Sequence, residues 1–385
     1  MRIAILRKIY TFHGGAEGFS NDLLTELAHA GHEIHIYAIK WQGVPSFKNI
    51  YFHKVPAITF SSFLRDLTFA VSSFFLLRKQ QRHLDIIQSH DKTLYQDIYR
   101  AGDGCHIEWL RQRWKRTGTS GKLSIILNPY HWLILSLERM IFKGQRFKKV
   151  IAISELVKRN IIENYNLNEK FIKVIYNGVN LERFSPEMKG KYRKGIRKMY
   201  SIDEDAFVVL FVGSGFERKC VYFLLKAVEL VPEPLTVLIV GKGNEGKFRG
   251  LIKRQNIIFC GAQKEVYKYY ASADVFLLPA IYEPFGNVHL EALASGLPVI
   301  TTKLSGASEI IKNRTHGFAV ERPENTDEIA ERLAYLMDKE VNRKMSIEAR
   351  KLAESFSFEK HIEEMSALYA ILGRGSYDSC LPICP

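Results

Sequence analysis

Cysteine is scarce in this sequence. Its 385 residues include only five cysteines, and no two pairs of them have the spacing of a zinc site. The last two, Cys380 and Cys384, are interpreted as part of a frayed terminus. This scarcity argues against a structural zinc site and favours a reducing, cytoplasmic compartment.

Long uninterrupted apolar runs are also missing. The opening residues MRIAILRK contain an apolar run that is too short for a signal peptide and is typical of a first strand. The longest apolar stretch, residues 123–142, is interrupted by Asn128, Pro129 and His131. We therefore expect no transmembrane span there.

Acidic residues are outnumbered by basic ones. The chain has 55 Lys and Arg against 41 Asp and Glu, which gives a net charge of +14. Such an excess favours anionic partners: nucleotides, phosphorylated substrates, nucleic acid or an anionic bilayer. The length exceeds that of one ordinary domain, and 46% hydrophobic residues suffice for large cores.

Strand-like and helix-like segments alternate along the chain, and a second alternating set begins at 207–213 after a polar, basic stretch. This pattern predicts an α/β fold with parallel, doubly wound sheets. We expect an N-terminal domain over 1–185 and a second domain over 186–355. The two Rossmann-like domains would face a central cleft, and a terminal helix and tail, 356–385, would pack back toward the first.

Two glutamates flank a short apolar segment in the stretch EPFGNVHLEALASGLPVIT, which follows the apolar strand VFLLPA. Ligand crevices of open α/β sheets lie beyond the carboxyl ends of strands, so Glu283 is expected to face a ligand. Gly286 allows close approach of the backbone, and Asn287 is expected to cap a helix that begins at Val288. Glu291 would lean back toward the mouth of that helix. Both carboxylates can then reach one polyhydroxylated ligand with a phosphate, such as a nucleotide sugar; the alternative is two acids without function.

The pattern Glu-x7-Glu, followed by ALASGLPVIT, resembles the signature of retaining glycosyltransferases of family 4, which have the GT-B fold. The resemblance covers nearly the whole chain and is greatest to the lipopolysaccharide core glucosyltransferases. It implies that the first domain, 1–185, binds the acceptor and that the second, 186–355, binds the nucleotide sugar. It also implies that Glu283 contacts the donor sugar and that Glu291 holds the ribose hydroxyls. It also implies backbone hydrogen-bond donors from the intervening residues Phe285, Gly286, Asn287 and Val288.

Two further segments are candidates for donor binding. Arg218 and Lys219 follow a strand and a glycine-rich loop, and Arg and Lys together can neutralise a diphosphate leaving group. The resemblance implies that role for them; a solvated basic turn is the alternative. After the first strand, YTFHGGAEGF allows a tight turn, and the resemblance places such a loop over the donor, with Gly15 as the candidate. An ordinary strand–helix turn is the alternative there.

Asp103 lies between two glycines in RAGDGCHIEW. Many members of the family carry a histidine at the acceptor side, whereas the lipopolysaccharide group resembles this sequence in having an aspartate. The resemblance thus implies that Asp103 orients or deprotonates the attacking hydroxyl. Two alternatives stay open: that Asp103 only caps a turn, or that His106 takes the role.

The segment 109–142 combines tryptophan and cationic residues with an apolar, aromatic stretch. This composition suits an interfacial segment on an anionic membrane leaflet, where each cation adds about 1 kcal/mol. The related core transferases carry a similar insertion. Nucleic-acid binding and a basic helix packed on a hydrophobic core are the alternatives.

Other motifs point elsewhere or are absent. GKGNEG, residues 241–246, matches the dinucleotide pattern G-x-G-x-x-G and raises a nicotinamide-dependent oxidoreductase as an alternative. The acids Asp203–Asp205 match a D-x-D metal motif but precede a strand, so we expect neither a metal nor a cofactor. No Walker A motif and no G-x-S-x-G elbow occur.

These observations predict a cytoplasmic enzyme, peripheral on the inner face of the cytoplasmic membrane. The resemblance implies transfer of a hexose, foremost glucose from UDP-glucose, to the lipopolysaccharide core or a lipid-linked glycan. Another donor sugar or lipid carrier is an alternative within the same fold. A non-catalytic scaffold that binds lipid or RNA is an alternative of another class, although we expect no nucleic-acid partner.

Overall fold

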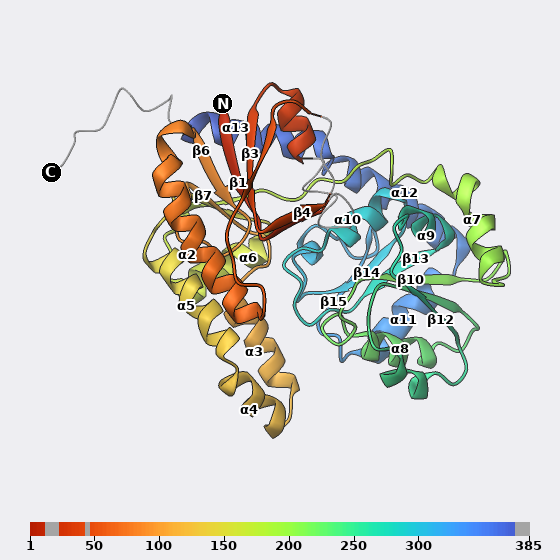
Figure 1. Ribbon diagram of the computed structural model, residues 1–385. Helices are drawn as coiled ribbons and strands as arrows, with labels where there is room; N and C mark the ends of the chain where they lie inside the picture. Colours follow the sequence, from red (N-terminus) through yellow and green to blue (C-terminus); the bar gives the residue numbers. More distant parts are fainter. Residues whose placement is uncertain (12–22, 43–46, 374–385) are drawn as a thin grey trace. The chain divides into compact units, whose positions relative to one another are not determined.

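The computed structural model describes residues 1–11, 23–42 and 47–373 (Figure 1). Gly15, one of the predicted donor-binding residues, lies outside the described residues, as do the two terminal cysteines. The fold and the site are therefore built from the remaining predicted residues.

Contacts within the chain divide it into two units. The first unit is residues 1–176 together with the chain from His361 onward, and the second unit is residues 177–360. The sequence predicts these two boundaries at 185/186 and 355/356. Each unit has its own parallel sheet and its own hydrophobic core.

The first unit is built on seven parallel strands whose side chains are mostly buried. In spatial order they are β5 (Ile50–Lys54), β3 (Glu33–Ala38), β1 (Arg2–Leu6), β6 (Ile86–Ser89), β7 (Ile98–Ala101), β8 (Lys149–Ala152) and β9 (Ile172–Val174). A separate parallel pair joins β2 (Ile9–Thr11) to β4 (Lys40–Gln42). Strands buried on both faces explain why the sequence shows continuous apolar runs there.

The helices that belong wholly or mainly to the first unit include α2 (Ser62–Gln80), α3 (His106–Arg116), α4 (Thr119–Leu127), α5 (Pro129–Lys143), α6 (Glu155–Tyr165) and α13 (Phe358–Leu372). Helix α2 buries Phe69 and Leu77 against the sheet. The terminal helix α13 packs on β6, where the Tyr369 hydroxyl donates to Gln88 Oε1 at 2.9 Å.

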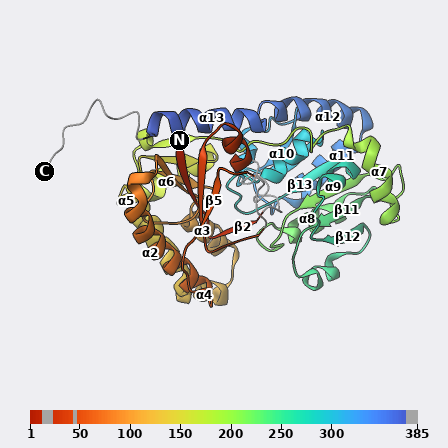
Figure 2. The same cartoon turned by 45° about the horizontal axis from the view of Figure 1, so that its top comes forward.

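The long apolar stretch 123–142 is broken into two helices. Asn128 is the N-cap of α5, its side chain accepts from the Tyr130 amide at 3.0 Å, and Pro129 occupies the first helical position. Both views show α4 at the end of the helices α2 and α5 that is farther from the sheet (Figures 1 and 2). Over the described ranges, no helix has the length and apolar character needed to cross a bilayer.

The second unit is built on six parallel strands. In spatial order they are β12 (Asn256–Gly261), β11 (Thr236–Val240), β10 (Val208–Val212), β13 (Val275–Leu278), β14 (Val299–Thr302) and β15 (Gly317–Val320). The helices packed around them are α7 (Met188–Met199), α8 (Val221–Leu230), α9 (Tyr267–Ser272), α10 (Asn287–Ala294), α11 (Thr326–Leu336) and α12 (Lys339–Glu354). The polar stretch predicted to hold the domain junction forms α7, which packs against α9.

Both sheets have the same strand order relative to the sequence. The first strand of each unit, β1 or β10, lies between the second and the fourth of its sheet. This order is that of a dinucleotide-type, doubly wound fold, so the predicted α/β class with two Rossmann-like domains is confirmed. A ligand crevice is expected where the strand order reverses, beyond the carboxyl ends of β1 and β6 or of β10 and β13.

Candidate active site

The two predicted donor-binding motifs of the second unit meet at its switch point. Strands β10 and β13 are parallel neighbours, with Val209 opposite Val275. The loop after β10 carries Arg218 and Lys219, and the loop after β13 carries Glu283. Their adjacency follows from the reversal of strand order, because two parallel neighbours present their carboxyl-end loops at the same edge.

The backbone of Glu283 is fixed by the loop that follows β14. Its amide donates to the Leu304 carbonyl at 3.1 Å, and its carbonyl accepts from the Gly306 amide at 2.8 Å. Together these bonds form an isolated parallel bridge between Glu283 and Ser305. A loop residue held at both backbone groups presents its side chain in one direction.

The carboxylate of Glu283 is buried between two cations. Lys219 Nζ donates to Glu283 Oε2, and Arg218 Nη1 lies 3.7 Å from the same oxygen. Burial would raise the pKa of Glu283, but the charges of Lys219 and Arg218 outweigh it, so the pKa is lowered and the group is ionised. Lys219 is buried too, whereas 40% of the Arg218 side chain is exposed.

Gly286 is required between the two glutamates. Its φ is +77°, and a Cβ at this position would lie 2.7 Å from His289 Nδ1 and 2.9 Å from Glu283 Cγ. His289 is fully buried, and its Nδ1 donates to the Gly286 carbonyl at 2.9 Å while its Nε2 lies 2.9 Å from the Thr301 hydroxyl. Burial lowers the pKa of His289 to about 4, so the imidazole is neutral at pH 7. The neutral His289 side chain thus packs against the turn at Gly286 and is bonded to its carbonyl.

The expected cap of α10 is wrong. Gly286, not Asn287, is the N-cap residue, and no side chain caps the helix. Asn287 is already helical, and its Oδ1 accepts from Asn177 Nδ2 at 2.5 Å. The His289 amide donates to the Gly286 carbonyl at 3.0 Å, whereas the amides of Asn287 and Val288, at the first turn of the helix, are open to an anion or a ligand hydroxyl.

Glu291 is buried one turn into α10. The Tyr270 hydroxyl donates to Glu291 Oε2 at 2.8 Å and also contacts the Val288 carbonyl at 3.2 Å. Burial raises the pKa of Glu291, with Tyr270 and the charge of Arg183 opposing the rise. The two glutamates of the motif therefore have opposite electrostatic environments.

Phe285 and Val288 complete the segment predicted to bind the donor through its backbone. The Phe285 side chain is fully buried, and its carbonyl accepts from the Ser305 hydroxyl at 3.4 Å. The Val288 carbonyl is occupied by Tyr270. Because the Val288 carbonyl is used internally, the amide is the backbone group with which Val288 can bind a ligand.

The G-x-G-x-x-G match has a packing explanation. A Cβ on Gly241 would lie 2.1 Å from the Gly213 carbonyl oxygen, and one on Gly243 would lie 2.2 Å from the Phe216 ring. The two glycine-rich loops thus lie against each other. After β11 the chain forms only the short 3-10 turns Glu245–Lys247 and Arg249–Leu251, so the helix N-terminus that a dinucleotide site requires is absent from this described segment. The oxidoreductase interpretation is therefore wrong.

In the first unit, Asp103 follows β7 and is exposed. Gly104 has a φ of +66° and leads into α3 through Cys105. Among the residues that the structure describes, none forms a hydrogen bond or ion pair with the Asp103 carboxylate. Its carboxylate is consequently open to a substrate hydroxyl.

His106, the alternative acceptor-side group, is engaged within the protein. Its Nε2 lies 3.0 Å from His131 Nδ1, and its amide donates to Glu138 Oε1 at 2.8 Å. Burial, together with the charge of Lys92, lowers the pKa of His106 to about 3, so the ring is neutral. The geometry favours Asp103 over His106 at this position.

A buried charge network beside Asp103 was not predicted. Lys92 Nζ lies 3.5 Å from Glu138 Oε1, and Glu138 is fully buried. The Tyr165 hydroxyl also donates to Glu138. The three side chains come from distant segments, and no local sequence pattern marks them.

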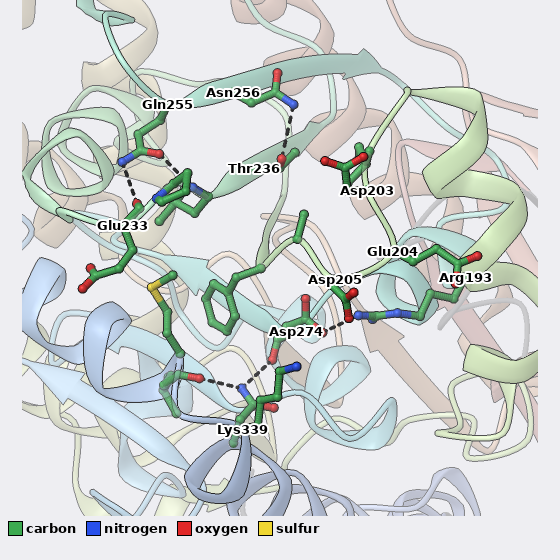
Figure 3. Close-up of a pocket in the computed structure, with 18 of the residues that line it drawn as sticks. Arg193, Asp203, Glu204, Asp205, Glu233, Thr236, Gln255, Asn256, Asp274 and Lys339 are labelled. Carbon is green, nitrogen blue, oxygen red and sulfur yellow. Dashed lines mark hydrogen bonds and ion pairs between the residues drawn. The ribbon is translucent and has the colours of Figure 1, made fainter.

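A cavity lies at the other edge of the second sheet, where the strands begin. It measures about 970 Å³ and is lined by residues that precede the strands, including Asp203, Thr236, Asn256 and Asp274 (Figure 3). Arg193 Nη2 contacts Asp274 Oδ1 at 2.8 Å there. Ligands of such sheets bind at the carboxyl edge, so this cavity is not the expected active site. Within the described ranges, no three His, Cys, Asp or Glu side chains are arranged as metal ligands.

Two family models match the chain. Residues 13–183 match glycosyltransferase family 4, and residues 193–352 match the glycosyl transferases group 1. Together with the two doubly wound sheets, these matches define the class: the chain is a glycosyltransferase of the GT-B type, with a family 4 domain followed by a group 1 domain.

Individual glycosyltransferases are similar to this chain. The lipopolysaccharide glucosyltransferase WaaG of Escherichia coli (strain K12) is 25% identical over 336 residues, covering 85% of this chain and 86% of that protein. The uncharacterized glycosyltransferase MJ1607 of Methanocaldococcus jannaschii is 33% identical over 192 residues, 47% of this chain and 49% of that relative's length. The crystal structure of WaaG, described as a glycosyltransferase involved in lipopolysaccharide biosynthesis, has a TM-score of 0.80 at 22% identity and covers 95% of this chain and 99% of that one. At 22% identity, the similarity to the WaaG structure supports the assignment of the fold.

Two supporting residues of the site were missed from the sequence. Tyr270 lies in VYKYYASA, where its phenol is one of three with no distinguishing local pattern. His289 lies within the motif itself, two residues before Glu291, and a histidine in an otherwise apolar helix was a signal that the sequence did offer.

Proposed function

We propose that this glycosyltransferase moves a hexose, foremost glucose from UDP-glucose, with retention of configuration, to a lipopolysaccharide core or a related lipid-linked glycan. The observation that carries the donor half is the buried Glu283 carboxylate between Lys219 and Arg218. It lies beside a helix mouth that Gly286 keeps clear. The identity of the sugar and of the acceptor comes from the likeness to the lipopolysaccharide glucosyltransferase.

Each group at this edge has a chemical task in the proposal. Ionised Glu283 accepts hydrogen bonds from hydroxyls of the donor sugar, since its lowered pKa leaves it no proton to give. Arg218 and Lys219 neutralise the charge that develops on the departing diphosphate. The open amides at the start of α10 add donors for the same oxygens. Glu291 accepts from the ribose hydroxyls.

Asp103 has the corresponding task on the acceptor in the first unit. An exposed carboxylate that has no hydrogen bond or ion pair to the described residues can orient the attacking hydroxyl or accept its proton. Asp103→Asn is therefore expected to reduce transfer to the glycan while leaving the binding of nucleotide unchanged.

We also propose that the first unit binds an anionic membrane through α4 and the start of α5, on the inner face of the cytoplasmic membrane. Phe60, Leu127 and Trp132 are 92%, 68% and 63% exposed. Phe63, Pro129 and Trp132 are among the residues that line an apolar hollow of about 470 Å³. Cationic residues accompany this apolar surface on α3 and α4: Arg111, Arg113, Lys115, Arg116 and Lys122. Apolar side chains with flanking cations are the features of an interfacial segment.

Vesicle sedimentation tests the membrane proposal. Leu127→Ser is expected to weaken binding to vesicles that contain anionic lipid, whereas Ile371→Ser, which changes a side chain that is 60% exposed on α13, serves as the matched control. Wild-type binding that is equal for neutral and anionic vesicles, or equal loss in both variants, would contradict the proposal.

Product analysis tests the enzymatic function. Purified protein is incubated with a panel of UDP-, GDP- and ADP-sugars and a lipopolysaccharide core acceptor, and products are identified by mass spectrometry. The expected result is one added hexose from UDP-glucose, lost in Glu283→Gln and kept in Glu265→Gln, an exposed acid of the same unit. Another donor in the panel would correct the sugar; no product from any donor, with no nucleotide released, would overturn the proposal.

A further inference from the structure

Tyr270 joins α9 to the second glutamate of the motif. Its side chain is fully buried, and its ring packs against Phe184 and Phe276 with centroid distances of 5.6 and 6.0 Å. A phenol enclosed in this way keeps one orientation. Its hydroxyl is directed at Glu291 Oε2 at 2.8 Å and at the Val288 carbonyl at 3.2 Å.

This contact occupies Oε2 of the Glu291 carboxylate. Among the described residues, none forms a hydrogen bond with Oε1. An ionised carboxylate accepts at both oxygens, whereas a phenol hydroxyl donates one proton. Two adjacent ribose hydroxyls are bound well only by acceptors that stay in one place. Because the glutamate side chain is long, the Glu291 carboxylate stays in one place only if a partner such as Tyr270 holds it.

We propose that Tyr270 is a positioning residue that presents the Glu291 carboxylate to the ribose hydroxyls of the donor nucleotide. The inference rests on the proposed function, since it deepens the account of the same donor site. Tyr270 acts through Glu291 and does not itself touch the sugar.

The charges around Glu291 give this positioning a pH signature. Burial raises the pKa of Glu291, and the Tyr270 hydrogen bond and the charge of Arg183 oppose that rise. The other charged groups nearby are committed or neutral: Arg350 of α12 donates to the carbonyls of Leu181, Phe184 and Ala294, and His289 is neutral. Removing the phenol hydroxyl would raise the pKa of Glu291 further, and a protonated Glu291 is a poorer acceptor for ribose.

The experiment measures UDP affinity by isothermal titration across pH 5 to 8 in wild type and Tyr270→Phe. We expect affinity to fall about tenfold at pH 7, the typical loss of a hydrogen bond to a charged group. We also expect the pH at which binding is lost to move upward. In a transfer assay the donor KM rises while kcat stays nearly constant. Tyr269→Phe is the matched control, because Tyr269 is also buried but its hydroxyl pairs with Tyr200 at 3.0 Å.

Two comparisons separate positioning from a general loss of structure. In a Glu291→Gln background, Tyr270→Phe is expected to shift no pH profile, because the titrating group is gone. UDP lacking both ribose hydroxyls should bind wild type and Tyr270→Phe equally. A Tyr270→Phe effect that persists in either comparison overturns the positioning role, as does UDP binding identical to that of the control. A wild-type protein that binds no nucleotide overturns the proposed function and this inference with it.

Discussion

Two carboxylates bracket the same strand of the second unit, and each is flanked by two cations. Asp274 precedes β13, with Arg193 Nη2 and Arg197 Nη2 at 2.8 and 2.9 Å. Glu283 follows β13, with Lys219 in contact and Arg218 at 3.7 Å. Each group consists of one carboxylate and two cations. The groups differ in how many hydrogen bonds their cations make within the protein.

At the amino edge, where the strands begin, the Arg197 guanidinium is bonded within the protein through all three of its nitrogens. Arg197 donates to four backbone carbonyls besides Asp274, namely those of Asp203, Glu204, Ala206 and Ser272. Asp274 also accepts from the Val208 amide at 2.9 Å. This arrangement ties the turn before β10 to the start of β13.

At the carboxyl edge the cations are only partly committed. Arg218 is the cation that is exposed, and its single close carboxylate lies beyond normal hydrogen-bond distance. A carboxylate flanked by two cations is therefore not in itself a sign of function. Unfilled donors, located where the strand order reverses, distinguish the site from the structural cluster.

The largest expected effect is on the structural cluster. Arg197→Met should lower the free energy of unfolding by about 3–5 kcal/mol, because it removes a fully buried guanidinium together with its bonds to Asp274 and to four backbone carbonyls. Urea denaturation measures this loss, with Lys198→Met on the exposed side of α7 as control. A loss below about 1 kcal/mol would show that the amino-edge cluster is not structural.

The next effect concerns the carboxyl edge. Arg218→Ala should reduce the transfer rate by about 10²–10³, the usual cost of removing one donor to a developing charge. The free energy of unfolding should stay within about 0.5 kcal/mol of wild type, as for an exposed side chain. Initial rates and urea denaturation of the same preparations measure both, with Lys253→Ala as the exposed control. Large destabilisation with normal transfer would reverse the contrast between the two edges.

A smaller effect is expected from the glycine turn. Gly286→Ala places a Cβ within 2.7 Å of His289 and requires a φ of +77°, which costs about 1–3 kcal/mol. Gly190→Ala is the control, since it adds a methyl group in open space on α7 and should stabilise the protein slightly. Thermal unfolding compares the two, and equal behaviour would show that the turn tolerates a side chain.

The smallest effect has the opposite sign. Because burial raises the folded-state pKa of Glu291, its stabilising contribution is complete below the unfolded pKa and is lost as pH rises through the folded pKa. At pH 7, above the unfolded pKa, the Glu291 carboxyl therefore destabilises the free protein, and Glu291→Gln should stabilise it by about 0.5–2 kcal/mol while weakening nucleotide binding. Urea denaturation at pH 7 and pH 4 should show the gain only at pH 7. A loss of stability at pH 7 would contradict the assignment.

The sequence predicted the parts of this comparison that depend on local patterns. Apolar runs located most strands, and Glu283, Gly286 and Glu291 were selected because a strand, a glycine turn and a helix follow one another. It did not predict β15, whose four residues begin with Gly317 and carry little strand preference.

Contacts between distant segments were beyond the sequence. Tyr270 and Glu291 meet because α9 packs on α10, and nothing local to either residue indicates it. Lys92 and Glu138 are brought together by the sheet and α5 in the same way. The prediction that Asn287 caps α10 was wrong for a simpler reason. The side-chain oxygen of Asn287 accepts a hydrogen bond from Asn177, and Gly286 occupies the N-cap position.

Hydrogen–deuterium exchange with and without UDP-glucose tests the central claim most directly. The account predicts slower exchange in peptides that cover 213–219 and 283–291 when the donor is present, with no change in peptides that cover 201–206 and 254–256. Protection at the second pair of segments, with none at the first, would place the ligand at the amino edge and contradict the account.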